Sequence, residues 1–259
     1  MDESSVVVDQ AQEVDPPPPI EEAPPPADPS APFVTADGRE LRVTATLDPV
    51  FEAKGFSRIG FRLIRRVMAI RYNGEDELAP QQVSQLSTAE LLRVDLATIA
   101  RGVGRLDAEK GPQLSLVIPI SYTSLASMKG RTELIAQLKE AGGLVKLGVI
   151  CEILDVDGVP PSVLLSVASL VKPFALLVVG CVADTNPKAI LRLEGSGLQA
   201  VSFACPADLG EQEFQAWAAI TLQAARKVAR SVLVYGAGTP ARAGILAALG
   251  ASHVSVGAA

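Results

Sequence analysis

The most constraining feature of this chain is an alternation between continuously apolar segments and amphipathic segments, which begins near residue 40. The apolar runs include 144–154, 174–182, 198–205 and 231–235. Each predicts a strand that is covered on both faces, because a half-exposed strand would show alternating polar residues. Strands of this kind separated by helices predict an α/β fold with a parallel sheet, and the number of repeats favours a closed barrel over an open sheet.

The chain opens this domain differently, with two strand-like segments in succession. Residues 41–49 and 58–70 have strand composition, and Gly55 lies in the connection, so we expect an antiparallel hairpin. A helix should follow from Ser87, because Ser87 and Glu90 have the spacing of a capping box. Further elements are expected as strands at 114–121 and 253–257 and as helices at 132–141, 161–171, 187–193, 211–230 and after Thr239.

The first 39 residues have a different composition from the rest. They contain no Lys or Arg before Arg39, and the proline runs 16–19 and 24–26 lie among acidic residues. Such a segment buries too little apolar surface to offset the entropy of ordering it, and its prolines favour extended polyproline II. We therefore divide the chain into a disordered, acidic, proline-rich tail (1–39) and a folded domain (40–259). A solubilising linker is favoured for the tail, with a docking arm as the alternative.

Charge and hydropathy exclude several classes of function. A net charge of −6 without a basic cluster argues against binding to a nucleic acid polymer. The longest apolar stretch, 159–183, is interrupted by three prolines and a lysine, which argues against a membrane span. The acidic start of the chain does not match an export signal, so we expect a cytoplasmic protein.

The three cysteines, Cys151, Cys181 and Cys205, lie near the ends of successive expected strands. Their wide spacing argues against a disulfide framework and against a common zinc finger. Gathered at one rim, three thiolates could bind zinc, but packing as small hydrophobic side chains is favoured. We therefore expect no metal at these residues.

One short motif allows a second interpretation. Residues Gly236 to Ala241 match the glycine fingerprint of an NAD(P)-binding turn, in which a helix N-terminus faces a pyrophosphate. That fingerprint normally lies in the first strand-helix unit and is followed about 20 residues later by an acidic residue. Because the chain ends at Ala259, a packing turn is favoured, with NAD(P) binding as a weaker alternative.

From about residue 40 the chain resembles the EAL domain, the bacterial phosphodiesterase fold that hydrolyses cyclic di-GMP. Pro49 corresponds to the proline of the family's first strand, and Gly60, Phe61 and Arg66 correspond to residues of its GFEALxR motif. Arg62 stands in place of the signature glutamate. The resemblance implies a modified TIM-type (β/α)8 barrel with an initial antiparallel hairpin.

The remaining family motifs are mostly altered at the positions that bind metal. The EITE strand keeps its carboxylates as Glu152 and Asp155, and the NxS strand keeps its serine as Ser121. The resemblance assigns the other positions to Pro119 for the asparagine, 177–180 for DDFG, 202–204 for KID, and Tyr235 and Gly238 for the glutamates of AEGVET. The family's reaction uses Mg²⁺ or Mn²⁺ held by oxygen ligands to activate a water. A single remaining carboxylate beside Arg62 cannot hold a metal pair, so we expect no catalytic residues, no metal and no cofactor.

The sequence thus predicts a catalytically inactive EAL-like domain that serves as a regulatory or protein-interaction module in bacterial cyclic di-GMP-type signalling. A protein partner or a homodimer is expected. A divergent phosphodiesterase and a non-hydrolysing cyclic di-GMP receptor remain alternatives, with Arg62, Arg66 and Glu152 as candidate ligand-binding residues. Ion pairs of these arginines with residues such as Glu152 are the favoured interpretation.

Overall fold

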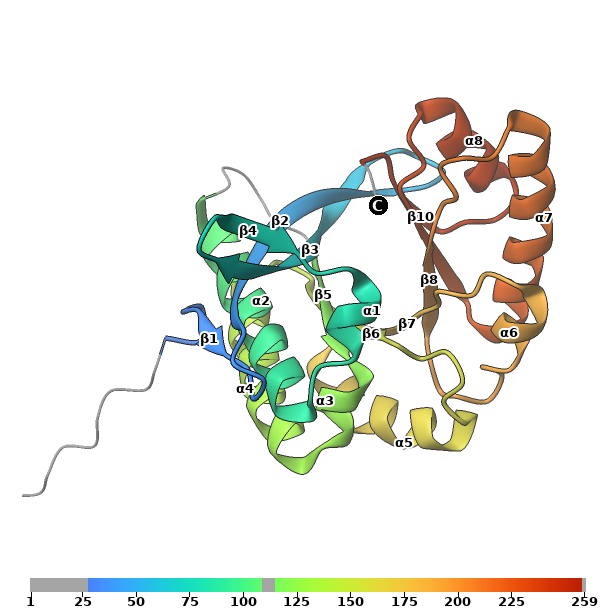
Figure 1. The fold of residues 1–259 in the computed structure, drawn as a ribbon. Coiled ribbons are helices and arrows are strands. Elements are labelled where there is room, and N and C mark those ends of the chain that lie inside the picture. Colours follow the sequence, from blue (N-terminus) through green and yellow to red (C-terminus); the bar gives the residue numbers. More distant parts are fainter. Residues whose placement is uncertain (1–27, 109–114, 258–259) are drawn as a thin grey trace, which may run out of the picture.

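The computed structural model describes residues 28–108 and 115–257 and contains a closed barrel of eight strands (Figure 1). Around the barrel the order is β2, β10, β9, β8, β7, β6, β5 and β3, and β3 pairs with β2 to close the ring. These strands are β2 (Glu40–Glu52), β3 (Arg58–Arg71), β5 (Ser115–Ser121), β6 (Gly148–Leu154), β7 (Leu177–Cys181), β8 (Ala200–Ala204), β9 (Ser231–Tyr235) and β10 (His253–Ser255). Strand β2 is antiparallel to both of its neighbours, and the other pairings in the ring are parallel. The predicted barrel with an initial antiparallel hairpin is confirmed.

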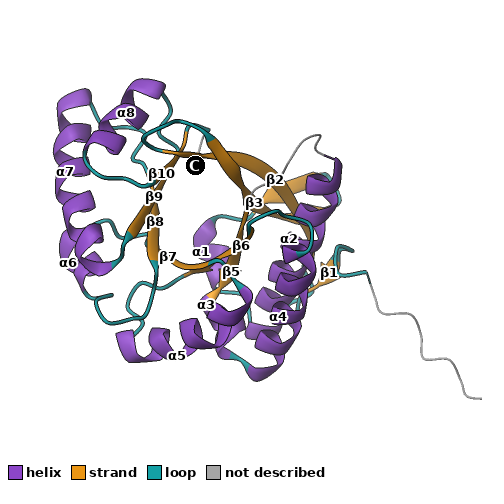
Figure 2. Cartoon of the chain, turned by 180° about the vertical axis from the view of Figure 1, so that it is seen from behind, coloured by secondary structure: helices purple, strands orange, loops and turns teal. Residues whose placement is uncertain are grey.

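The helices lie outside the ring of strands (Figure 2). They are α1 (Pro80–Ser84), α2 (Thr88–Ala108), α3 (Tyr122–Ala126), α4 (Met128–Gly142), α5 (Pro161–Val171), the 3-10 helix η1 (Lys172–Phe174), α6 (Pro187–Leu191), α7 (Glu211–Val228) and α8 (Pro240–Ala248). The capping box of α2 forms as predicted, because the Ser87 backbone N–H donates to the Glu90 carboxylate at 2.8 Å. Helix α4 begins earlier than expected, since the Ser127 hydroxyl accepts from the N–H of Gly130 and caps the helix there.

Strands β2 and β3 extend beyond the ring, where they form a four-stranded platform with the short strands β1 (Phe33–Val34) and β4 (Gly74–Glu77). Strand β1 pairs with β2, and β4 pairs with β3. Phe33 is buried against the apolar face that the platform shares with α2. Because β1 lies inside the segment 1–39 that composition assigned to the tail, the folded domain begins before residue 40. Residues 1–27 of that segment lie outside the described residues.

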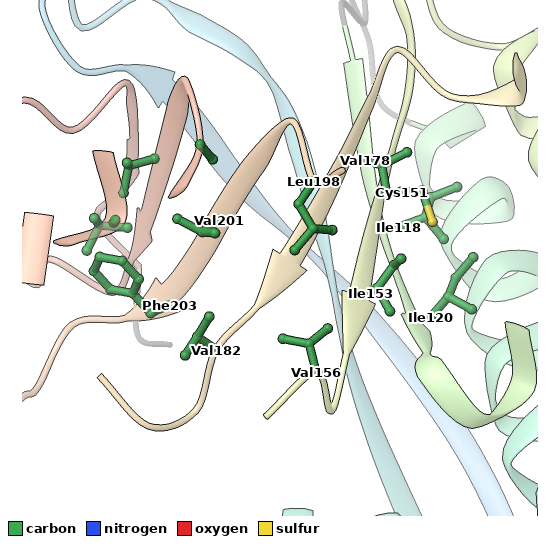
Figure 3. Packing of buried hydrophobic residues seen from close by; sticks show 14 of the residues in the cluster. Ile118, Ile120, Cys151, Ile153, Val156, Val178, Val182, Leu198, Val201 and Phe203 are labelled. Atoms are coloured by element: carbon green, nitrogen blue, oxygen red, sulfur yellow. The ribbon is translucent and has the colours of Figure 1, made fainter. Parts of the chain in front are cut away.

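The main hydrophobic core fills the space between the outer faces of the strands and the helices. Figure 3 shows part of it, with labelled side chains from β5, β6, β7 and β8 and from the connections next to these strands. The figure labels Ile118, Ile120, Cys151, Ile153, Val156, Val178, Val182, Leu198, Val201 and Phe203. A second apolar cluster lies inside the barrel and is formed by Val50, Val117, Ile150, Val179, Ala200, Leu233 and Tyr235. Inward and outward side chains therefore alternate along each strand, as the closed sheet requires.

This core explains several residues that the sequence left open. Cys151 and Cys205 are buried in it as small apolar side chains. Within residues 28–108 and 115–257, no group of His, Cys, Asp and Glu is arranged to hold a metal ion, so the zinc alternative finds no support. On α7, Phe214 is fully buried and Trp217 packs beside it while its indole N–H donates to Thr185.

Among the helices of the described segments, none has the length and apolar character that a bilayer crossing requires.

A buried ion pair fixes α2 against the barrel. Asp95 of α2 is fully buried, and it accepts from Arg65 Nη1 at 2.7 Å and from the backbone N–H of Ser121 at 3.1 Å. Burial raises the pKa of Asp95, whereas the Arg65 guanidinium and the hydrogen bonds from Ser121 oppose the rise. Asp95 therefore connects α2 to β3 and β5. The buried charge of Asp95 is compensated by the charge of Arg65.

We predict that Arg65→Ala lowers the free energy of unfolding by about 3–5 kcal/mol, because it leaves the Asp95 carboxylate buried without its partner. Urea denaturation followed by circular dichroism measures this. Arg66→Ala is the matched control, since Arg66 lies on the same strand but forms an exposed ion pair with Glu77, and it should change stability little. Equal losses in the two variants would contradict a special role for the buried pair.

Candidate functional site at the mouth of the barrel

Five inward-facing residues come together near the carboxyl ends of the barrel strands, where barrel enzymes build their active sites. Arg62 lies on β3, Glu152 on β6, Cys181 on β7, Ser202 on β8 and Tyr235 on β9. The alternation along each strand sends these side chains inward, because neighbouring residues such as Cys151 and Val201 belong to the outer core. The closure of the barrel therefore assembles a polar cluster from residues far apart in sequence.

The centre of this cluster is an ion pair between Arg62 and Glu152. Arg62 Nε donates to Glu152 Oε2 at 2.8 Å, and the side chains are 14% and 0% exposed respectively. Ser202 Oγ donates to the other carboxylate oxygen at 2.6 Å. Both oxygens of Glu152 are therefore engaged by protein donors, which compensates the cost of burying its charge.

An aromatic ring completes the surroundings of Arg62. The guanidinium carbon of Arg62 lies 3.9 Å from the centroid of the Tyr235 ring, a cation–π arrangement. Burial disfavours the charged form of Arg62, but the Glu152 carboxylate outweighs burial, so the pKa of Arg62 is raised and the side chain stays charged. Burial also raises the pKa of Tyr235 well above its ordinary value, which keeps the phenol neutral.

These residues do not fit the Mg²⁺ or Mn²⁺ pair that the resemblance implies. Hard divalent cations need several oxygen ligands, with carboxylates prominent among them. Here Glu152 already binds the Arg62 cation. The other carboxylate beside Arg62 is the buried Asp48 of β2, whose pKa is raised by burial against the opposing effects of Ser255 and Arg62. The neighbouring Cys181 thiol is no substitute, since burial raises its pKa to about 12 and keeps it protonated.

The third residue predicted for this site, Arg66, lies away from the other two. It is exposed, and its Nε donates to Glu77 of β4 at 2.8 Å. Arg66 lies four positions after Arg62 on an extended strand, which is about 13 Å along the chain. Because β3 continues past the barrel into the platform, the structure brings Arg62 and Glu152 together and leaves Arg66 at the rim.

A cleft of about 240 Å³ opens beside this rim. Its lining includes Arg65, Arg66, Glu77, Asp155 and Asp157, together with Cys181 and residues of α1. The volume is below the roughly 300–1,000 Å³ of common small-molecule sites. Its three carboxylates are unfavourable for a phosphate ligand. The helix α1 and the acidic strand β4 that shape the cleft have no counterpart among the sequence predictions, because both are too short to produce a periodic pattern.

The glycine-rich turn after β9 has a packing role in this structure. Gly236 and Gly238 have φ angles of 72° and 74°, which a residue with a Cβ rarely adopts. The Gly236 N–H donates to Ser255 Oγ at 3.1 Å, and the Ala237 N–H donates to the Ser255 carbonyl at 2.9 Å. These donors bind β10 rather than facing outward, and the surrounding sheet is a barrel, so the geometry favours a packing turn over an NAD(P) site.

Sequence reasoning favours a structural ion pair between Arg62 and Glu152 but does not foresee the two residues that complete it. Tyr235 is noted only as the replacement of a glutamate, and Ser202 lies where the resemblance finds a lysine missing. The signal that could have found them is the inward register shared with Glu152. An arginine, an aromatic ring and a hydroxyl at corresponding inward positions of one barrel predict contact.

Solved structures of other proteins have the same fold as this chain. No family profile matches the chain, and no curated protein matches it by sequence. Among solved structures, the FimX EAL domain from Pseudomonas aeruginosa bound to c-di-GMP is similar with a TM-score of 0.62 and 15% identity, over 82% of this chain and 87% of that chain. An EAL domain protein from Listeria monocytogenes has a TM-score of 0.59 and 16% identity over 82% and 85% of the two chains. The chain has the fold of EAL domains.

A longer protein shows the same similarity. The S helix-GGDEF-EAL part of Vibrio cholerae LapD has a TM-score of 0.61 and 12% identity to this chain. The match covers 82% of this chain and 52% of that one. This chain therefore spans about half the length of that LapD structure, and the similarity concerns the EAL fold.

We predict that Arg62→Ala lowers the free energy of unfolding by about 3–5 kcal/mol, because it leaves the Glu152 carboxylate buried in the barrel without its charged partner. The double variant Arg62→Met/Glu152→Leu should recover most of this loss, since it removes both charges and keeps similar volume. Urea denaturation of the two variants and the unaltered chain measures the difference. A double variant that is less stable than Arg62→Ala would show that the pair is not the source of the effect.

Proposed function

We propose that this chain is an EAL-type domain that does not hydrolyse cyclic di-GMP and instead serves as a regulatory or protein-interaction module. The observation that carries the proposal is the ion pair between Arg62 and Glu152 in the middle of the barrel mouth. It pairs Glu152, a carboxylate retained from the family motif, with a permanent cation, whereas catalysis of the kind that the resemblance implies needs metal ions. No step of such a hydrolysis can be assigned to the side chains of the cluster.

The solved structures of the same fold define the signalling context of the proposal. One is described as a FimX EAL domain bound to c-di-GMP, and another as the Bacillus subtilis YkuI protein with an EAL domain in complex with substrate c-di-GMP and calcium. The fold therefore occurs in proteins that bind this nucleotide. We propose that the present chain works in the same kind of signalling, in the cytoplasm, by contacting a protein partner or a second copy.

Binding of cyclic di-GMP without hydrolysis is the second candidate, but the rim does not favour it. A receptor would need cations free to face two phosphates. Arg62 is enclosed by Glu152 and Tyr235, and Arg66 is engaged by Glu77. The carboxylates of Asp155 and Asp157 add negative charge to the same cleft. These features support a scaffold role more than a receptor role.

Exposed apolar residues support the interaction part of the proposal. Val163, Leu165 and Leu170 of α5 are 40%, 44% and 43% exposed. Leu164 and Val167 on the same helix are buried in the core, and the three exposed apolar residues flank this buried face, whereas Ser162, Ser166 and Ser169 lie on the outward side. These exposed apolar side chains are the surface feature of α5 from which we propose a contact with another protein.

We predict that the purified chain releases no linear product from cyclic di-GMP in the presence of Mn²⁺ or Mg²⁺, because Glu152 at the barrel mouth is already bound to Arg62 and Ser202. Chromatography of the nucleotides after prolonged incubation measures this. Glu152→Gln is the control variant, since it keeps the shape of the side chain and removes its charge. Turnover by the unaltered chain that disappears in Glu152→Gln would overturn the proposed lack of catalysis.

We also predict that calorimetric titration with cyclic di-GMP shows no heat of binding at micromolar nucleotide, because the arginines at the mouth are already paired. Arg66→Ala and Arg71→Ala form a matched pair of variants, since both arginines are exposed on β3 and bind acidic residues of β4. Micromolar binding that is weakened by Arg66→Ala but not by Arg71→Ala would establish the receptor role in place of the scaffold role.

A further inference from the structure

One edge of strand β2 is open along its middle. On this side β2 pairs with β1 at residues 40–41 and with β10 at residues 50–52. In the part of the chain that the structure describes, no strand pairs with residues 42–47 on this side. Gly257 approaches the Asp48 side chain and so covers the next position. An unpaired strand edge presents N–H and C=O groups to any extended segment that can reach them.

A basic hollow of about 440 Å³ borders this edge. It is lined by Ser30, by Arg42, Thr44 and Ala45 of β2, and by Ala100, Arg101, Gly104 and Arg105 of α2. Three arginines and no carboxylate therefore contribute to its lining. Arg42 pairs with Glu75 through Nη2, but its buried Nε has no hydrogen-bond partner among the described residues. Arg101 Nη2 donates to the Ser30 carbonyl at 3.0 Å, so the hollow holds the chain where it enters the domain.

The chain itself contains a segment that suits this hollow. The 27 residues before Asp28 include seven acidic residues and no Lys or Arg. Residues 1–15 contain no proline, and Val6, Val7 and Val8 are consecutive β-branched residues, which favour a strand. Residues 16–27 connect this acidic segment to the domain. At about 3.1 Å per residue in a proline-rich segment, twelve residues reach about 37 Å, which exceeds the roughly 20 Å length of the open edge.

We propose that residues 4–15 of this chain add to the open edge of β2 as a further strand, with acidic side chains facing the arginines of α2. Main-chain hydrogen bonds supply the pairing, and the charges of Asp9, Glu13 and Asp15 against Arg101 and Arg105 supply the preference for this segment. The connection to the domain gives the segment a high effective concentration at its own edge. The added strand closes the edge against other chains. This inference is independent of whether the barrel binds cyclic di-GMP.

Hydrogen–deuterium exchange of the full chain tests the added strand. Amides of residues 6 and 8 and of β2 residues 42–47 should exchange about tenfold more slowly in the unaltered chain than in Val7→Pro, because proline interrupts strand pairing. Amides of α4 serve as the internal control. Their exchange rates should be the same in both proteins, because Val7 lies before the folded domain and its substitution should leave the domain folded. Exchange of residues 6–8 at the rate of a free peptide, or unchanged β2 amides in Val7→Pro, would overturn the proposal.

Carbodiimide coupling tests the charge contact and the identity of the occupant. Arg105→Lys keeps the positive charge and introduces an amine, which should couple to a carboxylate of Asp9, Glu13 or Asp15. Lys146, which lies in the connection before β6, is the control amine and should not couple to these residues. The yield within one chain should stay constant over a hundredfold dilution. Coupling that occurs between chains and falls with dilution, or no coupling at the introduced amine, would contradict docking of the chain's own segment.

Discussion

The ion pair between Arg62 and Glu152 is the interaction on which the interior of this barrel depends. A carboxylate with no solvent exposure is tolerated when its charge and its lone pairs are both satisfied. Arg62 supplies the charge and Ser202 supplies the second hydrogen bond. Because the three residues lie on β3, β6 and β8, the network connects strands that are not neighbours in the sheet. The barrel mouth is therefore held together from inside by polar contacts.

The same network decides what the site can do. A buried ion pair is a weak source of stability, because the cost of desolvating both charges is comparable to their attraction. Its main effect here is to fix the position of the Arg62 guanidinium against the face of Tyr235. Any movement of this side chain would break its contacts with Glu152 and with Tyr235 together. The contacts that fix Arg62 thus also engage one oxygen of Glu152, while Ser202 engages the other.

Much of the fold follows from local patterns in the sequence. Continuous apolar runs predict the parallel strands, and the Ser87–Glu90 spacing predicts the start of α2, because each signal depends on residues close together in the chain. Elements that depend on distant partners escape this reasoning. Phe33 belongs to the core because of the platform formed by β2 and β3, and its surrounding sequence resembles a tail. The separation of Arg66 from Arg62 likewise reflects the length of β3 beyond the barrel, which composition does not reveal.

The way the ring closes accounts for its remaining open edge. Strand β2 has 13 residues, whereas β10, its ring neighbour on the side away from β3, has 3. A partner this short satisfies one end of β2, and β1 with 2 residues satisfies the other end. The middle of β2 must therefore bind a further segment or remain exposed to water, whatever the side chains are. An acidic segment tethered next to an arginine-lined edge is a solution to that requirement within a single chain, because it protects the backbone and balances the charge together.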